Sequence, residues 1–236
     1  MNSIKQNIVQ VISQIDTATE KCGRNAGSVQ LLAVSKTKPI AAIEEAIAAG
    51  HYAFGENYVQ EGVEKIQYFA QKTSPEPLTW HFIGPIQSNK TRPVAEHFDW
   101  VHSIDRAKIA RRLSEQRPAH LPPLNVLLQV NTSGEDSKSG LNFAEVEALA
   151  AEVAAMPNLV LRGLMSIPEK ADDYDSQFAA FSSLRDAMTA LQAQHPQLDT
   201  LSMGMSGDLE AAVAAGSTIV RIGTAIFGAR DYTTKA

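Results

Sequence analysis

The sequence predicts an α/β protein that folds as a single (β/α)8 barrel, the TIM-barrel architecture. Eight short apolar segments alternate with helical segments, and strict alternation of this kind favours parallel strands. Eight strand–helix units in 236 residues leave about 30 residues for each unit, which matches the usual size of such a barrel. No linker rich in Gly and Pro divides the chain, so one domain over 1–236 is expected. A doubly wound open sheet is the alternative, because it is built from the same units.

A helix is predicted before the first strand. Apolar residues from Ile4 to Ala18 recur at the spacing of one helical face, and Gly23 follows as a typical C-terminal glycine. The expected order is therefore a leading helix at 1–23, followed by the barrel at 31–228.

The strands are predicted from short apolar runs bounded by turn residues. In chain order these runs lie at 31–35, 52–54, 78–83, 100–104, 126–130, 159–167, 198–202 and 218–222. The helices between them are predicted at 39–49, 58–71, 90–97, 106–117, 141–156, 174–194 and 208–215. Three residues are expected to set the ends of elements. Gly50 closes the helix at 39–49, Asp105 caps the helix at 106–117, and Pro168 ends the strand at 159–167.

Composition and charge exclude several classes of partner. The formal net charge is −5, and no cluster of Lys and Arg suggests a face for nucleic acid. No apolar run is long enough to cross a bilayer, and the N-terminus lacks the apolar core of a signal peptide. The single cysteine, Cys22, excludes an internal disulfide and fits a cytoplasmic location. The six histidines show no ligand spacing, so no metal site is expected, and the expected partner is a small molecule.

Lys36 follows the first strand and is the first candidate for chemistry. Side chains alternate along a strand, so Leu32, Val34 and Lys36 share one face, which in a barrel points inward. Burial disfavours an ammonium, and the neutral amine is a nucleophile that forms a Schiff base with a carbonyl. A solvated lysine at a strand end is the alternative.

Two loops near the C-terminus have the features of a phosphate site. In a (β/α)8 barrel a phosphate is often held after strands seven and eight. After the seventh strand, Ser206 and Gly207 are expected to open a helix, where backbone N–H groups and the helix dipole favour an anion. After the eighth strand, Gly223 permits close approach to an oxygen, and Thr224 adds an N–H and a hydroxyl. The alternative is a helix cap at Ser206, with glycines that serve turns only.

The side chains of three charged residues near these loops must be oriented to suit a bound anion. Asp208 and Glu210 lie in the first turn of the predicted helix and would repel an anion, so their carboxylates are expected to point away from it. Arg221 shares the inward face of the last strand with Ile219 and Gly223, and a buried guanidinium needs an acceptor. A cofactor ring nitrogen is one candidate acceptor. A salt bridge to a carboxylate is the alternative.

Six motifs, spread over nearly the whole chain, carry a resemblance to a known family. They are Ala33-Val34-Ser35-Lys36-Thr37-Lys38, Phe54-Gly55-Glu56-Asn57-Tyr58, the run 80–90, Gly163-Leu164-Met165, the run 201–206 and the run 220–228. Together they resemble the pyridoxal phosphate homeostasis proteins of the YggS type. The resemblance extends from 31 to 232, and the combination of motifs is highly specific.

The resemblance implies a barrel similar to the N-terminal domain of bacterial alanine racemase, with pyridoxal 5′-phosphate (PLP) bound as an aldimine of Lys36. It implies that Arg221 faces the pyridine nitrogen and that Asn57 neighbours the cofactor. The residues implied to hold the phosphate are Ser206, Gly207, Gly223 and Thr224. Members of this family are regarded as PLP carriers without established turnover, and PLP-dependent apo-enzymes are the implied recipients.

Two enzyme functions are the alternatives. A PLP-dependent amino-acid racemase needs a second acid/base group, which in alanine racemase comes from the partner subunit of a two-domain dimer. The chain ends at Ala236, so that second domain is not expected. Without it, the protein is expected to be a monomer. A Schiff-base aldolase acting on a sugar phosphate would use the same barrel, lysine and phosphate site.

Three further lysines are expected on the rim of the barrel. Lys38 is placed in the loop after Lys36. Lys90 and Lys138 are candidates for transient aldimines during handover of PLP, with ordinary solvated lysines as the alternative.

Overall fold

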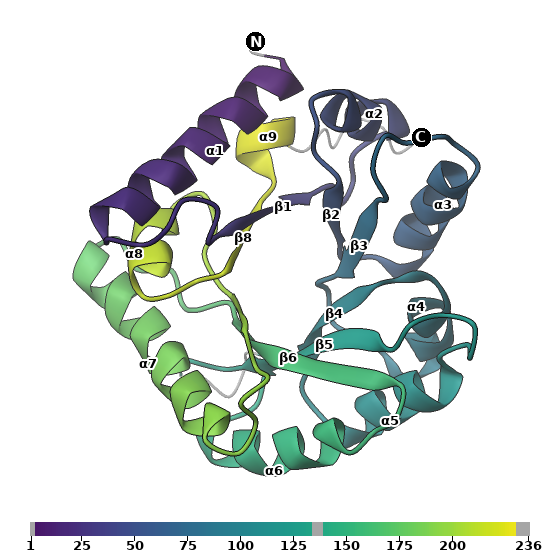
Figure 1. Cartoon of the computed structure of the whole chain (residues 1–236), viewed down its shortest axis with the longest axis vertical. Helices are drawn as coiled ribbons and strands as arrows, with labels where there is room; N and C mark the ends of the chain where they lie inside the picture. The colour runs from purple at the N-terminus through teal and green to yellow at the C-terminus, as the bar shows by residue number, and fades with distance from the viewer. Residues whose placement is uncertain (1–2, 134–138, 230–236) are drawn as a thin grey trace.

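Eight parallel strands form a closed barrel that is surrounded by helices (Figure 1). The computed structural model describes residues 3–133 and 139–229. The strands are neighbours in chain order from β1 to β8, and β8 returns to pair with β1, with Leu32 opposite Arg221. This last pairing closes the sheet, so the barrel prediction is confirmed and the open sheet is excluded.

The barrel strands are short, as is usual for this architecture. They are β1 (Gln30–Val34), β2 (Ala53–Glu56), β3 (Thr79–Phe82), β4 (Trp100–Ile104), β5 (Leu124–Val130), β6 (Leu159–Ser166), β7 (Thr200–Ser202) and β8 (Ile219–Ile222). The helices are α1 (Ile4–Lys21), α2 (Ile40–Ala48), α3 (Val59–Ala70), α4 (Thr91–His97), α5 (Ala107–Gln116), α6 (Phe143–Ala154), α7 (Tyr174–Gln192), α8 (Leu209–Ala214) and α9 (Thr224–Phe227). A 3₁₀ helix, η1 (Ser88–Lys90), precedes α4.

Helix α1 packs over the place where β8 meets β1, as an addition to the repeating units. It begins with a capping box, in which Ser3 Oγ accepts the Gln6 N–H and Gln6 Oε1 accepts the Ser3 N–H. Asn7 Nδ2 donates to Ile226 O at 2.8 Å, and α1 lies beside α8 and α9 (Figure 1). The predicted extra helix at the N-terminus is therefore confirmed.

The apolar core has two layers. The larger layer lies between the outer face of the strands and the helices, and it contains Phe54 and Phe82. The smaller layer lies inside the barrel, where Leu32, Ala53 and Ile219 pack together. Because neighbouring side chains on a strand face opposite ways, this separation confirms the inward direction predicted for Leu32 and Ile219.

The cap predicted for α5 is wrong. Arg106, not Asp105, occupies the N-cap position, and no side-chain hydrogen bond caps the helix. The helix begins one residue later than predicted, which moves Asp105 out of the capping position. Its Oδ1 instead pairs with Arg106 Nη1 at 2.8 Å.

The prediction that Ser206 and Gly207 open a helix is also wrong. Both residues lie in a turn, in which Asp208 N donates to Met205 O at 3.3 Å, and Asp208 is the N-cap of α8. The helix therefore starts after the turn. Conversely, β8 is followed by the short helix α9, which was not predicted, with Gly223 as its N-cap.

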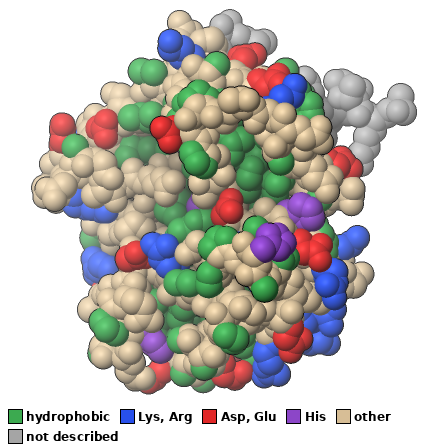
Figure 2. All heavy atoms as spheres, turned by 45° about the vertical axis from the view of Figure 1, so that its right-hand side comes forward, with side chains coloured by type: hydrophobic (Ala, Val, Ile, Leu, Met, Phe, Trp, Pro, Cys, Tyr) green, Lys and Arg blue, Asp and Glu red, His purple; other side chains and the backbone are tan. Residues whose placement is uncertain are grey.

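No helix in the described part of the chain is long and apolar enough to cross a membrane. On the face shown in Figure 2, acidic and basic side chains lie interspersed among neutral ones.

Candidate functional site

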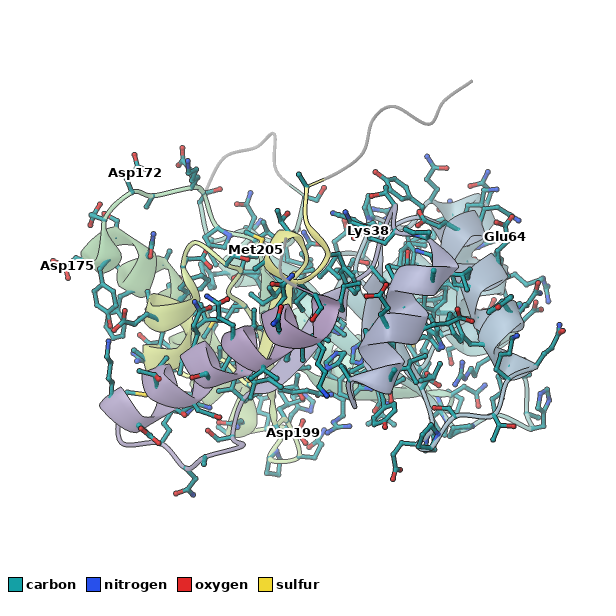
Figure 3. All side chains as sticks on the ribbon, turned by 90° about the horizontal axis from the view of Figure 1, so that it is seen from above. Lys38, Glu64, Asp172, Asp175, Asp199 and Met205 are labelled. Atoms are coloured by element: carbon teal, nitrogen blue, oxygen red, sulfur yellow. The ribbon has the colours of Figure 1, made fainter. Side chains whose placement is uncertain are left out.

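The predicted site residues lie at one end of the barrel, where the strands end. They are Lys36 after β1, Asn57 after β2, Ser206 and Gly207 after β7, and Arg221, Gly223 and Thr224 at the end of β8. In the sheet these strands run β2, β1, β8, β7, so the structure brings all seven residues to adjacent strand ends. In Figure 3, Lys38 and Met205 mark this end on the upper side, and Asp199, which precedes β7, lies on the lower side.

Lys36 stands in a turn that follows the strand. β1 ends at Val34, and Lys38 N donates to Ser35 O at 3.1 Å, which closes a four-residue turn around Lys36 and Thr37. Thr37 has φ +62°, a left-handed conformation that β-branched residues rarely adopt. Lys36 is half-buried. Because the strand stops before Lys36, the turn, and not strand alternation, sets the direction of its side chain.

A group of charges, which we call the Lys65 cluster (buried Glu56 and Lys65 with half-buried Glu61), holds this turn. Glu56 is fully buried, and its Oε1 accepts bonds from Ser35 Oγ at 2.6 Å and Lys65 Nζ at 2.7 Å. Lys65 Nζ also donates to Ser35 O at 2.8 Å and to Glu61 Oε1 at 2.6 Å. Glu61 Oε1 accepts the Thr37 N–H at 2.6 Å. Burial raises the pKa of the Glu56 carboxyl, and the Lys65 ammonium opposes that rise.

The rim lysines have different surroundings. Lys38 Nζ donates to the carbonyl oxygens of residues 227–229 at distances from 2.8 to 3.2 Å, and so ties the turn to the segment after α9. Lys90 is exposed at the end of η1. Lys138 lies outside the described residues.

Arg221 points into the barrel and is 5% exposed. Its Nη1 donates to Ser202 Oγ at 2.7 Å, and its Nη2 donates to Ser166 O at 2.8 Å. Within the described residues no carboxylate forms an ion pair with it, so its partners there are neutral oxygens. Burial lowers the pKa of Arg221 to about 10, although the nearby Asp208 carboxylate favours the charged form.

Two histidines extend this hydrogen-bonded chain through the barrel interior. Ser202 Oγ lies 2.9 Å from His102 Nδ1, and His102 Nε2 lies 2.9 Å from His81 Nδ1. His81 also stacks on Trp100, with ring centroids 5.3 Å apart. Burial lowers the pKa of His81 to about 3 and that of His102 well below its usual value. Both rings are therefore neutral, which allows each to accept one hydrogen bond.

Because these histidines are buried and neutral, we expect the protein to lose stability as the pH falls from 7 to 5. In the unfolded chain a histidine has a pKa near 6.5 and takes up a proton in this range, whereas folded His81, with a pKa of about 3, does not. The unfolded state then binds more protons, so the free energy of unfolding drops, by on the order of 2 kcal/mol from His81 alone. Urea unfolding at both pH values measures the drop.

Two variants assign this pH dependence. His81→Gln should lose much of it, whereas His120→Gln, which replaces an exposed histidine, should keep it. An identical pH dependence in His81→Gln and in the parent protein would contradict the assignment.

The carboxylates beside the loop 205–208 have defined partners. Asp208 folds back, and its Oδ1 accepts the Met205 N–H at 2.6 Å. Glu210 pairs with Lys21 of α1 at 2.8 Å, so it points away from the strand ends as predicted. Burial raises the pKa of Asp208.

The loop after β8 approaches β1 closely. A Cβ built at Gly223 would lie 3.2 Å from Val34 O, so glycine permits this approach. Thr224, the first residue of α9, is exposed. Arg221 N donates to Gly204 O at 2.9 Å, which holds the end of β8 next to the chain that follows β7.

Asn57 borders a cavity of about 290 Å³ at the strand ends, together with Ile83, Gln129 and Ile167. Asn57 Oδ1 is buried and has no hydrogen-bond partner among the described residues. The backbone of Gly84 packs against that of Asn57 so closely that a Cβ at Gly84 would clash with it. A larger groove of about 550 Å³ lies elsewhere, between α6 and α7.

Several residues that build this site were not predicted from the sequence. They are Glu56, Glu61, Lys65, His102, Ser166 and Ser202. The only local signal among them is the spacing of Glu61 and Lys65, four residues apart on a helix, which favours an ion pair. Within residues 3–133 and 139–229 no group of three or more His, Cys, Asp or Glu side chains is arranged to hold a metal ion.

Comparisons with known proteins place the chain among relatives of similar length. A family model described as "Alanine racemase, N-terminal domain" matches residues 8–231. The pyridoxal phosphate homeostasis protein of Vibrio cholerae is 64% identical over 236 residues, with 100% of both chains covered. That of Escherichia coli K12 is 59% identical over 235 residues, again with 100% of both covered. A solved structure of PipY from Synechococcus elongatus, described as having PLP bound, is 38% identical with a TM-score of 0.82, and covers 96% of this chain and 100% of PipY.

Proposed function

Because the chain belongs to the alanine racemase N-terminal domain family and, within it, to the pyridoxal phosphate homeostasis proteins, we propose that it binds PLP at the strand ends of the barrel. The whole chain, 1–236, would act as one PLP-binding domain. The observation that carries the proposal is that Lys36 lies in the turn directly after β1, while Arg221 lies on β8, the strand that pairs with β1 through Leu32 and Arg221. An amine and a fixed guanidinium thereby flank one opening.

The residues at this opening suit the chemical groups of PLP. Lys36 would hold PLP through its amine, which would form a C=N bond to the aldehyde carbon with loss of the carbonyl oxygen as water. Arg221 uses two of its five N–H donors on Ser202 and Ser166, and a remaining donor would be available to the pyridine nitrogen. Because a guanidinium does not give up its proton, Arg221 would keep that ring nitrogen unprotonated, and PLP held there would be a weak electron sink.

The phosphate group would be held by the loops after β7 and β8. Backbone N–H groups of Ser206, Gly207, Gly223 and Thr224, with the two hydroxyls, supply the donors. The turn geometry of 206–207 does not weaken this assignment, because consecutive N–H groups in a turn also bind anions. Asn57, whose side-chain oxygen has no hydrogen-bond partner among the described residues, would contact the cofactor from the β2 side.

The function that fits best is storage and delivery of PLP. A reversible C=N bond holds a reactive aldehyde and releases it again when water attacks. We propose that PLP-dependent apo-enzymes in the cytoplasm are the recipients, that the protein acts as a monomer, and that it has no catalytic turnover of its own. Its relatives are named for homeostasis of PLP, in line with this role.

We expect the purified protein mixed with PLP to acquire an absorption band at the edge of the visible region, caused by the C=N bond conjugated with the ring. Borohydride reduction should fix PLP to the chain, and peptide mass mapping should find it on Lys36. Lys38 should remain unlabelled in the wild-type protein, because its ammonium is bonded to three carbonyl oxygens.

Three other outcomes would contradict the proposal. A label found mainly on a lysine other than Lys36 would show that the opening does not bind PLP as described. A colourless protein that traps a sugar phosphate with borohydride would indicate an aldolase. Equilibration of D- and L-amino acids well above the rate with PLP alone would indicate a racemase.

A further inference from the structure

All hydrogen bonds from the Lys65 cluster to the turn go to the two residues that flank Lys36. Ser35 is held twice, through Oγ by Glu56 at 2.6 Å and through its carbonyl oxygen by Lys65 at 2.8 Å. Thr37 is held through its backbone N–H by Glu61 at 2.6 Å. The cluster therefore fixes the backbone on both sides of Lys36.

The conformation that is fixed in this way is strained. Thr37 has φ +62°, and it is the one non-glycine residue in the described chain with a positive φ. A β-branched residue persists in this region only when its surroundings over-determine it, and such strain is concentrated at functional sites. The charged acceptor on the Thr37 N–H supplies the strong directional bond that this requires.

The cluster is poorly suited to be a simple stabiliser. Lys65 is 4% exposed and Glu56 is fully buried, so both charges have lost their hydration. Apolar residues of similar size often stabilise a fold as well as a buried ion pair does. Unlike apolar groups, charged groups form directional hydrogen bonds, which set the orientation of a particular N–H or C=O group. All three donors of Lys65 are used within the cluster and the turn, so its amine is committed to this role.

We propose that Glu61 and Lys65 are positioning residues for Lys36: they clamp Ser35 and Thr37 so that the turn presents the Lys36 amine to the aldehyde of PLP. This inference rests on the proposed function, because it assumes that Lys36 forms the bond. It adds that the reactivity of Lys36 is set by helix α3, which carries both residues and makes no other predicted contribution to the site.

The test separates attachment of the aldehyde from binding of the phosphate and ring. Two ligands are compared: PLP, and pyridoxine 5′-phosphate, which has a hydroxymethyl group in place of the aldehyde and forms no C=N bond. Glu61→Ala removes the acceptor of the Thr37 N–H. We expect the rate of C=N bond formation with PLP to fall at least about tenfold, since small misplacement of a reacting group has effects of this size. Affinity for pyridoxine 5′-phosphate should stay within about twofold.

Two further variants sharpen the result. Glu64→Ala changes an exposed carboxylate on the same helix, which points outward in Figure 3, and should leave both measurements unchanged. Thr37→Gly, combined with Glu61→Ala, should recover most of the lost rate, because glycine adopts positive φ without strain. Thermal unfolding of each variant confirms that it is folded.

The outcomes distinguish the inference from the function on which it rests. If wild-type Lys36 is labelled but Glu61→Ala reacts with PLP at the normal rate, the positioning role is wrong and PLP binding stands. If Glu61→Ala weakens both ligands equally, the cluster supports only the fold, and the positioning role is again wrong. If wild-type Lys36 is not labelled at all, the proposed function itself fails.

Discussion

Replacing Lys65 with methionine is expected to lower the free energy of unfolding by about 3–5 kcal/mol, the usual result of removing one partner of a buried ion pair. The methionine fits the space of the lysine chain, so the loss comes from charge. Glu56 would remain fully buried without its cation, and Ser35 O and Glu61 would lose a donor. Urea unfolding at neutral pH measures the change.

The matched control is Lys21→Met. Lys21 also pairs with a glutamate, Glu210, at 2.8 Å, but its side chain is 61% exposed, and exposed pairs contribute little or nothing. The double variant Glu56→Leu/Lys65→Met should recover part of the loss, because it removes the orphaned charge as well. If Lys65→Met unfolds at the same urea concentration as Lys21→Met, the ion pair of Lys65 and Glu56 does not contribute to stability as proposed.

The pH dependence of this defect has a definite sign. Burial raises the folded-state pKa of Glu56 above its unfolded value. The free energy of unfolding therefore falls as the pH rises and Glu56 loses its proton. Without Lys65 the pKa rises further. The difference between Lys65→Met and the parent protein should therefore be smaller at pH 5 than at pH 8.

Replacing Gly163 with alanine is expected to cost on the order of 2–5 kcal/mol, from the sum of steric overlap and backbone strain. Gly163 has φ +151°, and a Cβ there would clash with Thr200 O on the neighbouring strand β7. The register between β5 and β6 shifts at this point, since Val126 pairs with Leu161 but Leu127 pairs with Gly163. Urea unfolding again measures the loss.

The shift in register explains why this glycine matters. Leu161 and Leu164 both pack in the outer core although they are three residues apart, which strict alternation forbids. One extra residue, Arg162, resets the alternation. Gly163 makes that bulge possible, and the bulge directs the rest of β6, up to the Ser166 carbonyl that accepts from Arg221.

Gly207→Ala is the control for this prediction. A Cβ at Gly207 meets no atom within 4 Å and its φ is not positive, so stability should change by no more than about 1 kcal/mol. The variant also keeps the backbone N–H that is proposed to contact the phosphate, so affinity for PLP should persist. Equal destabilisation by Gly163→Ala and Gly207→Ala would contradict the role of the bulge.

The errors in predicting the elements have local causes. Strand positions were predicted well because a buried strand is marked by a short apolar run, which is a local feature of the sequence. The predicted bounds of β4 match the structure in full. The cap at Asp105 failed because a shift of one residue at a helix start changes which residue caps. The turn at Ser206 and Gly207 was predicted to open the helix at 208–215, because a helix start and a turn use the same residue types.

The sequence by itself determined the barrel, the strand ends from which site residues project, and a pattern of motifs specific enough to indicate the family. The barrel and the strand ends follow from period and spacing, which act over a few residues, whereas the family follows from the resemblance of the motifs. Only the tertiary structure decided what holds those residues in place. Ser202 contacts His102 across 100 positions of sequence, Arg221 finds neutral oxygens on β6 and β7, and α3 reaches back to clamp the turn at Lys36. The physical reason is that such contacts join residues far apart in the sequence, and these residues meet only once the barrel has closed.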